Sequence, residues 1–420
     1  GREHAHLAVL NPASRPGVLP GHAHRMLPLL GESGVVNDPP AAVAEVHRRH
    51  DPLRHAQQHL LVRPGRIRHE VMQRLVARAR GRWRQVRRHR LYALALERSH
   101  QAGAIPTQSC VTVSMAKPLG QVSHVSIELF GYAEHTHETT WVGSKGGLRL
   151  RYDAPIGRVE MTGKSHQRTR STWDGVETHD FSNVSVAAID KNIRQRLEWQ
   201  AKKIDLPAGR YDTIFPSGSV ADFFTYFFWM SGARDAHEGQ SVFSKPGGGT
   251  RVGEKLSNVN INMYSDPASS LLPGSPFVAH AASSDFGSVF DNGQKQSRVD
   301  WIKDGVLQSL LQTRASAKLT SLPYTPLGDN LIMKVDNGSG SLDDLVKKVD
   351  NGLLVTTLWY IRMVDPNTLL LTGLTRDGVY YVKNGEVQGA TNNFRWNDSP
   401  VSALSRIVHA GATEWTQPRE

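Results

Sequence analysis

A group of two histidines and a glutamate is the first feature of the sequence that could do chemistry. His135, His137 and Glu138 form an HxHE group. Alternate residues on a β-strand point to the same face, so the two imidazoles could chelate a metal ion together. The alternative is a pair of ordinary histidines on the surface of a strand, and the sequence favours that simpler interpretation.

A second candidate is the pair His237-Glu238, which begins like the motif of a zinc peptidase helix. Such a helix places two histidines on one face with a glutamate beside the bound water. The residues four and five positions after His237 are Ser241 and Val242, so no second histidine follows. A structural or substrate-contacting role is therefore favoured over metal binding.

Nucleophilic and phosphate-binding chemistry have weaker support. The sequence contains no GxSxG elbow, and Ser241 and Ser244 are near His237 only along the chain. The glycine run at 247–249 lacks the Lys-Ser/Thr of a phosphate-binding loop, so it predicts a flexible turn.

The formal net charge of +11 is unevenly distributed along the 420 residues. Residues 1–100 contain 18 Arg, no Lys and 7 acidic residues, and the remaining 320 residues hold 32 basic and 32 acidic residues. A neutral balance over residues 101–420 argues against a nucleic-acid-binding surface there. For the Arg/His-rich segment itself, three interpretations stay open: a loosely helical or disordered arm, a nucleic-acid-binding arm, or a stretch that is not native.

The compartment is predicted from cysteine usage and apolar runs. Cys110 is the only cysteine, so an internal disulfide is impossible, which fits a reducing compartment. The sequence shows neither the layout of a secretory signal nor a run of 18 apolar residues. We therefore expect a cytoplasmic protein that does not associate with a membrane.

Between residues 120 and 210 the pattern predicts strands followed by one helix. Alternating apolar residues indicate strands at 122–130, 148–152 and 157–162. Apolar residues at helical spacing then predict a helix over 186–204, which the following Leu-Pro-Ala-Gly ends. A domain boundary is expected at 206–210.

The C-terminal half predicts hairpins around one buried helix. Residues 220–230 are apolar on almost every side, which is typical of a helix buried all round. Turn signals recur at 246–249, 291–293, 303–305, 336–338, 377–378 and 383–385. Asn-Gly and Asp-Gly favour tight hairpins, so an antiparallel or barrel-like domain is expected.

Seven segments, in order, resemble the TldD/PmbA family, also called modulators of DNA gyrase. They are LFGYAEHTHETT (129–140), RTRSTWDG (168–175), IDLPAGRYDTIFPSGSVADF (204–223), ARDAHEGQSVFSKPGGGTRVGEKLSN (233–258), DNGQKQSRVDWIKDGVLQSLLQTR (291–314), GLLVTTLWYIRMVDPNTLLLTGLTRDGVYYVKNGEV (352–387) and NNFRWNDSPVSALSRI (392–407). The resemblance does not extend to residues 1–100. It implies an α+β chain: an N-terminal α/β domain followed by a β-rich, hairpin-built, barrel-like C-terminal domain. We divide the chain into an atypical segment at 1–116, the rest of the N-terminal domain at 117–205 and the C-terminal domain at 206–420.

The resemblance also implies a partnership around a zinc site. TldD-type chains carry HExxxH plus a later cysteine, whereas the matching positions here are Phe224, Thr225 and Trp229, and Cys110 precedes the matched region. None of these three can serve as a zinc ligand or base. The chain is thus similar to the TldE (PmbA) type: no catalytic residue and no cofactor of its own, with zinc in a TldD-type partner subunit and an unfolded peptide as substrate.

The residues expected to face that partner or peptide are charged turn residues and their neighbours. They are Arg234, His237, Glu238, Lys245 and Arg251, each of which could instead be a solvated loop residue. Two other functions stay open: a stand-alone binding protein that modulates DNA gyrase, and a self-sufficient metallopeptidase using His135 and His137. A homodimer also stays open.

Overall fold

The computed structural model describes residues 9–10, 105–119, 127–270, 272–376, 378–416 and 418–419, the first two ranges by their backbone alone. The Arg/His-rich segment expected over residues 1–100 therefore lies outside the described residues, except for the short strand β1 (Val9–Leu10).

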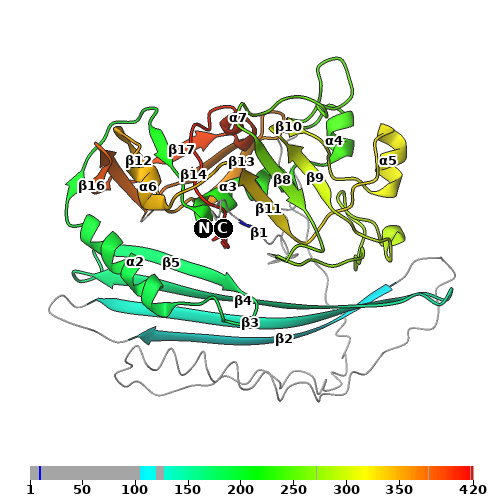
Figure 1. Cartoon of the computed structure of the whole chain (residues 1–420), viewed down its shortest axis with the longest axis horizontal. Helices are drawn as coiled ribbons and strands as arrows, with labels where there is room; N and C mark the ends of the chain where they lie inside the picture. Colours follow the sequence, from blue (N-terminus) through cyan, green and yellow to red (C-terminus); the bar gives the residue numbers. More distant parts are fainter. Residues whose placement is uncertain are drawn as a thin grey trace, which may run out of the picture.

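One layer of the molecule is an antiparallel sheet with the order β2-β3-β4-β5 (Figure 1). Its strands are β2 (Ile105–Leu119), β3 (Glu128–Gly143), β4 (Arg149–Ser165) and β5 (Arg170–Thr178). Strand β4 unites the two strands predicted at 148–152 and 157–162, because its pairing with β3 continues without a break through Gly157. The predicted boundary after residue 116 falls within β2, whose pairing with β3 runs on to Leu119.

Helix α2 (Val186–Trp199) covers the face of this sheet that turns toward the rest of the chain (Figure 1). It begins at Ser185, whose side chain accepts a hydrogen bond from the Ala188 N–H. Its apolar stripe, Val186, Ile189, Ile193 and Leu197, is buried against β3 and β4. The predicted apolar spacing of this helix is confirmed.

The helix ends five residues before the predicted end at 204, for a tertiary reason. Lys203–Ile204 form strand β6, which pairs in parallel with Ala390 and Thr391 of β16. The Gln200 side chain meanwhile bonds the backbone of Ser171, with Ser171 N to Oε1 at 3.1 Å and Nε2 to Ser171 O at 2.7 Å. Both interactions draw the chain out of the helix.

The remainder of the chain forms three further open sheets, ordered β1-β11-β8-β9-β10, β6-β16-β15-β12-β7 and β13-β14-β17. The strands are β7 (Asp212–Ile214), β8 (Ile261–Ser265), β9 (Val299–Lys303), β10 (Val306–Leu307), β11 (Leu331–Val335), β12 (Asn351–Val355), β13 (Trp359–Asp365), β14 (Leu370–Leu374), β15 (Val379–Lys383), β16 (Glu386–Thr391) and β17 (Arg395–Asp398). The helices are α3 (Ser217–Trp229), α4 (Ala233–His237), η3 (Val289–Asp291), α5 (Arg314–Thr320), α6 (Leu342–Val346) and α7 (Pro400–Leu404). The predicted α+β class with a strand-rich C-terminal region is confirmed, and the described sheets are open rather than closed.

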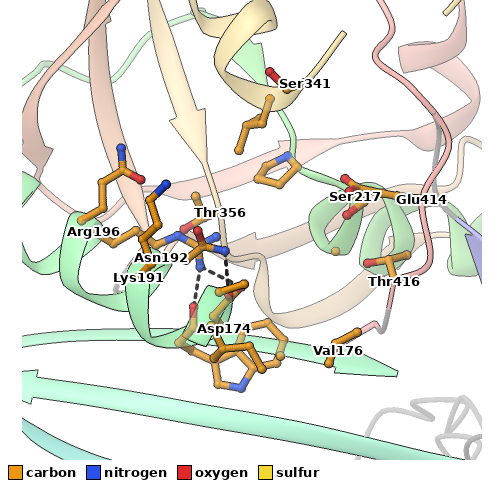
Figure 2. Close-up of a pocket in the computed structure, with 18 of the residues that line it drawn as sticks. Asp174, Val176, Lys191, Asn192, Arg196, Ser217, Ser341, Thr356, Glu414 and Thr416 are labelled. Carbon is orange, nitrogen blue, oxygen red and sulfur yellow. Dashed lines mark hydrogen bonds and ion pairs between the residues drawn. The ribbon is translucent and has the colours of Figure 1, made fainter. Parts of the chain in front are cut away.

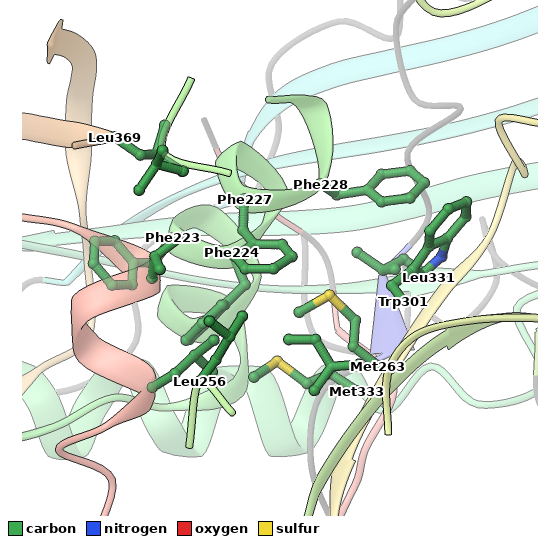
Figure 3. Packing of buried hydrophobic residues seen from close by; sticks show 14 of the residues in the cluster. Phe223, Phe224, Phe227, Phe228, Leu256, Met263, Trp301, Leu331, Met333 and Leu369 are labelled. Carbon is green, nitrogen blue, oxygen red and sulfur yellow. The ribbon is translucent and has the colours of Figure 1, made fainter. Parts of the chain in front are cut away.

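Helix α3 lies inside the largest apolar core, as its all-round apolar sequence predicts (Figure 3). Phe227 packs edge-on against Phe243 with ring centroids 5.0 Å apart, and Phe228 packs against Trp301 at 5.2 Å. Edge-to-face aromatic pairs add to the apolar area that these rings bury. Neither α3 nor any other helix among the described residues is long and apolar enough to cross a membrane.

Two of the predicted turns are two-residue hairpins. Asp304 and Gly305, with φ of 50° and 78°, join β9 to β10, and Asn384 and Gly385, with φ of 51° and 76°, join β15 to β16. Positive φ at both central residues matches the right-handed twist of the flanking strands.

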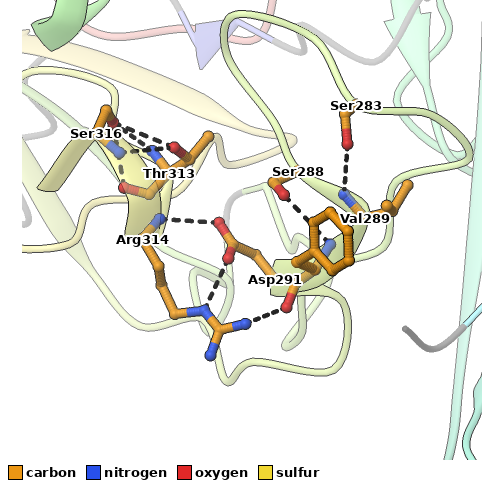
Figure 4. Close-up of polar contacts among 8 residues, drawn as sticks. Ser283, Ser288, Val289, Asp291, Thr313, Arg314 and Ser316 are labelled. Carbon is orange, nitrogen blue, oxygen red and sulfur yellow. Dashed lines mark hydrogen bonds and ion pairs between the residues drawn. The ribbon is translucent and has the colours of Figure 1, made fainter. Parts of the chain in front are cut away.

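The turn signal at 291–293 has a different outcome (Figure 4). Asp291 is buried, and its carboxylate accepts hydrogen bonds from the backbone N–H and the Nε of Arg314, at 3.0 and 2.7 Å. This aspartate therefore ties η3 to the start of α5 instead of closing a hairpin.

Candidate functional site

A cavity of about 480 Å³ lies where the α2 layer meets the C-terminal region (Figure 2). One wall comes from β5 and α2, and the other from the first residues of α3 and α6 together with β12. The lining mixes polar and apolar side chains, and its polar residues are Asp174, Asn183, Ser185, Lys191, Asn192, Gln195, Arg196, Ser217, Ser341, Asp343, Thr356, Glu414 and Thr416.

A hydrogen-bonded group fixes the first wall. Asp174 on β5 accepts a hydrogen bond from Asn192 Nδ2 at 2.9 Å and forms an ion pair with Arg196 Nη1 at 3.3 Å. Arg196 Nη1 also donates to the Trp173 carbonyl at 2.6 Å. Because both charged side chains are largely buried, the pair holds α2 against β5 and sets the shape of the wall.

The opposite wall includes the start of α3. The N-cap of α3 is Pro216, which offers no side-chain acceptor, and Ser217 and Gly218 follow it along the cavity. The first N–H groups of a helix have no partner within the helix. The start of α3 thus forms this wall of the cavity.

A third side of the cavity is formed by a segment from the far end of the sequence. Glu414, Trp415 and Thr416 line the cavity, and the Trp415 indole lies edge-on to His179 with ring centroids 4.8 Å apart. The Ala412 N–H donates to the Gly340 carbonyl at 3.1 Å. This segment links the two sides of the cavity.

The charged residues predicted to face a partner or peptide lie elsewhere. Arg234, His237, Glu238, Lys245 and Arg251 are on α4 and in the loop after it, and none of them lines the cavity. Figure 1 shows α4 at the end of the C-terminal region away from α2.

These five residues form local contacts rather than one cluster. Arg234 Nε is 2.8 Å from Glu238 Oε1 within one helical turn, and Arg251 Nε is 2.7 Å from Glu254 Oε2. His237 and Lys245 are exposed. Their role as a contact surface stays a prediction.

The two histidines of the HxHE group have separate surroundings. His135 is 4% exposed, and its Nε2 lies 2.5 Å from the His179 carbonyl, whereas His137 Nε2 lies 3.7 Å from Asp153 Oδ1. Burial lowers the pKa of His135 below its ordinary value, which disfavours the protonated form. Across the described ranges of the chain, no three His, Cys, Asp or Glu residues are grouped to hold a metal ion.

The sequence reasoning assigned no role to the cavity residues. Trp173 and Asp174 belong to the segment RTRSTWDG, which resembles the family. Nothing in that segment indicates that Asp174 pairs with Asn192 and Arg196 of α2. The residues at 414–416 have no periodic pattern or motif that could have marked them.

The geometry describes an α+β protein with a cavity of mixed polar and apolar lining between two layers. The model of the PmbA/TldA metallopeptidase C-terminal domain matches residues 208–418, half of the chain. The chain therefore belongs to the PmbA/TldD family, a family related to metallopeptidases, as its sequence segments predicted.

Three solved structures are similar to the chain in fold. They are TldE from Thermococcus kodakarensis (16% identity, TM-score 0.56, covering 68% of this chain and 64% of that one), a candidate modulator of a DNA gyrase from Thermotoga maritima (17%, 0.55, 70% and 66%) and a candidate modulator of DNA gyrase from Bacteroides thetaiotaomicron (13%, 0.56, 71% and 65%). The chain thus spans slightly less than two thirds of the length of each. No curated protein matches the sequence.

Proposed function

We propose that this chain is a TldE (PmbA)-type subunit that lacks the metal motif and works in a complex with a TldD-type subunit. The complex degrades or trims unfolded peptides in the cytoplasm. In this proposal zinc and its three or so protein ligands belong to the partner, and the present chain completes the assembly and helps to hold the peptide.

The composition of α3 carries the proposal. At the positions matching the HExxxH motif the helix has Phe224, Thr225 and Trp229, and the first two are buried in the apolar core. The only carboxylate on α3 is Asp222, and the helix has no His or Cys. Apolar rings fill this space without requiring hydrogen-bond partners, which suits a helix that holds no ion.

The decisive experiment mixes this chain with a family member that carries HExxxH. Cleavage of an unfolded peptide is expected only in the mixture, and a chelator is expected to abolish it, because the zinc-bound water needs ligands and a base that α3 does not provide. Metal analysis of this chain alone is expected to find no stoichiometric zinc. Chelator-sensitive cleavage by this chain alone, at a rate comparable to the mixture, would mean that it is itself the protease.

Alanine variants test the proposed contact surface. His237→Ala, Glu238→Ala and Lys245→Ala are expected to weaken assembly or raise the apparent KM of the mixture, while the metal content per complex stays unchanged. Lys348→Ala is a matched control for Lys245, since Lys348 is also exposed but follows α6. If all four variants assemble and cleave like the native chain, α4 and the loop after it are not part of the interface.

A second candidate function, modulation of DNA gyrase, rests on the descriptions of two of the similar structures. A supercoiling assay with purified gyrase tests it directly. A change in supercoiling rate caused by this chain without any partner would favour this function over the subunit.

A further inference from the structure

The side chain of Arg419 lies between two indole rings that come from different layers of the molecule. Its guanidinium carbon is 5.0 Å from the ring centroid of Trp173 and 5.0 Å from that of Trp359. Trp173 belongs to β5, and Trp359 is the first residue of β13. A cation within about 6 Å of an indole face is attracted by the ring's electrons, and here two rings share one cation.

The backbone of the same residue is held by a buried carboxylate. The Arg419 N–H donates to Asp222 Oδ1 at 2.6 Å, and Asp222 is only 3% exposed on α3. Asp222 therefore recognises a main-chain amide, while the two indoles recognise the side chain attached to it.

One wall of this group is oriented by its own contacts. The Trp173 indole donates through Nε1 to Glu160 Oε2 at 3.2 Å, and Glu160 is in turn 3.2 Å from Arg158 Nη1. The Trp173 ring thus has a hydrogen bond that does not involve Arg419. Groups that keep their orientation in this way lose less entropy when a ligand binds.

We propose that Trp173, Trp359 and Asp222 form a binding site for an arginine residue of an extended peptide, and that Arg419 of this chain occupies it in cis. The selection of peptide substrates by this site rests on the proposed function, whereas the recognition of arginine does not. Arginine fits better than lysine, since the guanidinium is planar and weakly hydrated and stacks on aromatic faces.

Occupation of the site also shapes the cavity beside it. Trp173 lines the cavity as well as the arginine site, and Glu414 to Thr416, just before Arg419, form the third side of the cavity. A peptide that displaces Arg419 would therefore free both spaces together. A tethered ligand competes at an effective concentration on the order of millimolar, so the native chain admits only peptides that bind well.

The test measures binding of a fluorescein-labelled peptide with the sequence of residues 411–419 to the full chain by fluorescence anisotropy. Arg419→Ala is expected to bind this peptide at least about tenfold more tightly than the native chain, because the cis ligand is gone. A peptide with glutamine in place of the arginine is expected to bind Arg419→Ala at least about tenfold more weakly than the arginine peptide. Arg210→Ala, which removes an exposed arginine elsewhere, should bind like the native chain.

A second pair of variants shows whether a loss of binding comes from the missing indole ring or from a loss of the fold. In the Arg419→Ala background, Trp359→Leu is expected to abolish binding of the arginine peptide, while Trp359→Phe keeps most of it, and thermal unfolding of each variant reports whether the fold is retained. Equal binding by Arg419→Ala and the native chain, or equal binding of the arginine and glutamine peptides, would overturn the proposal. Because only this chain is present, the result is independent of whether the mixture with a TldD-type subunit cleaves peptides.

Discussion

The two principal helices of this protein are buried in different ways. Helix α2 covers one face of the four-stranded sheet and buries a single aliphatic stripe there, with Phe181 as the one aromatic residue among the described members of that core. Helix α3 is surrounded by strands and helices of the C-terminal region, and its phenylalanines are buried on several sides.

The difference explains where the cavity can form. A helix buried on one face leaves its other residues available, and α2 uses Lys191, Asn192 and Arg196 to line the cavity. A helix buried all round offers only its end, and α3 contributes Pro216, Ser217 and Gly218. The cavity thus lies where a polar helix face meets the beginning of an apolar helix.

The largest change in stability is expected when the C-terminal region is separated from the four-stranded sheet and α2. A fragment of residues 206–420 is predicted to fold alone, because every buried member of the α3 core lies within it and only the two-residue edge strands β1 and β6 are lost from its described sheets. Calorimetry is expected to show a cooperative thermal transition for this fragment. A broad, non-cooperative melt would mean that the sheet layer is required for the C-terminal core.

Within the α3 core, Phe227→Ala is expected to lower the free energy of unfolding by about 3–5 kcal/mol. Phe227 is 0% exposed and packs against Phe243, so the truncation leaves a cavity that the rigid surroundings cannot fill. Phe290→Ala is the matched control, since this phenylalanine is 59% exposed, and it should change the value by less than about 0.5 kcal/mol. Urea unfolding of both variants measures the contrast, and similar losses would contradict it.

In the α2 core, Gly163→Ala is expected to cost about 1–3 kcal/mol through overpacking. A Cβ atom at this position of β4 would lie 2.2 Å from Ile193 Cγ2 and 3.4 Å from Leu197 Cδ1, so the Ile193 side chain or α2 would have to shift.

The double variant Gly163→Ala with Ile193→Ala sharpens this test. It should lose less stability than the sum of the two single changes, because the shortened side chain makes room for the new methyl group. Strict additivity in urea unfolding would show that α2 does not rest on Gly163 as closely as the structure indicates.

The last prediction concerns how the free energy of unfolding depends on pH through His135. An unfolded histidine has a pKa of about 6.5, and burial lowers the pKa of His135 in the folded chain, so below about pH 6.5 the unfolded state takes up a proton that the folded state does not. The free energy of unfolding is therefore expected to fall between pH 7 and pH 5, by at most about 1.4 kcal/mol per pH unit from this group.

His135→Gln should flatten that slope without removing it, because burial also lowers the pKa of His280. Urea unfolding at several pH values measures the slope for the native chain and the variant. Identical slopes would show that His135 does not contribute.

The sequence by itself determined the elements whose signals are local. The one-sided spacing of Ile189, Ile193 and Leu197 predicted α2, and the all-round apolar run predicted a buried α3. The hairpins at 303–305 and 383–385 follow from two residues each, since Asp-Gly and Asn-Gly accept positive φ whatever the rest of the chain does.

Only the tertiary structure decided how distant residues meet. The end of α2 at Trp199 depends on the pairing between β6 and β16. Residues 291–293 do not close a hairpin because Asp291 binds Arg314, more than 20 residues later. The arginine site is the extreme case, because Trp173, Asp222, Trp359 and Arg419 lie on four separate segments. Local propensity acts over one or two turns of chain, whereas a site assembled from four segments exists only once the layers have packed together.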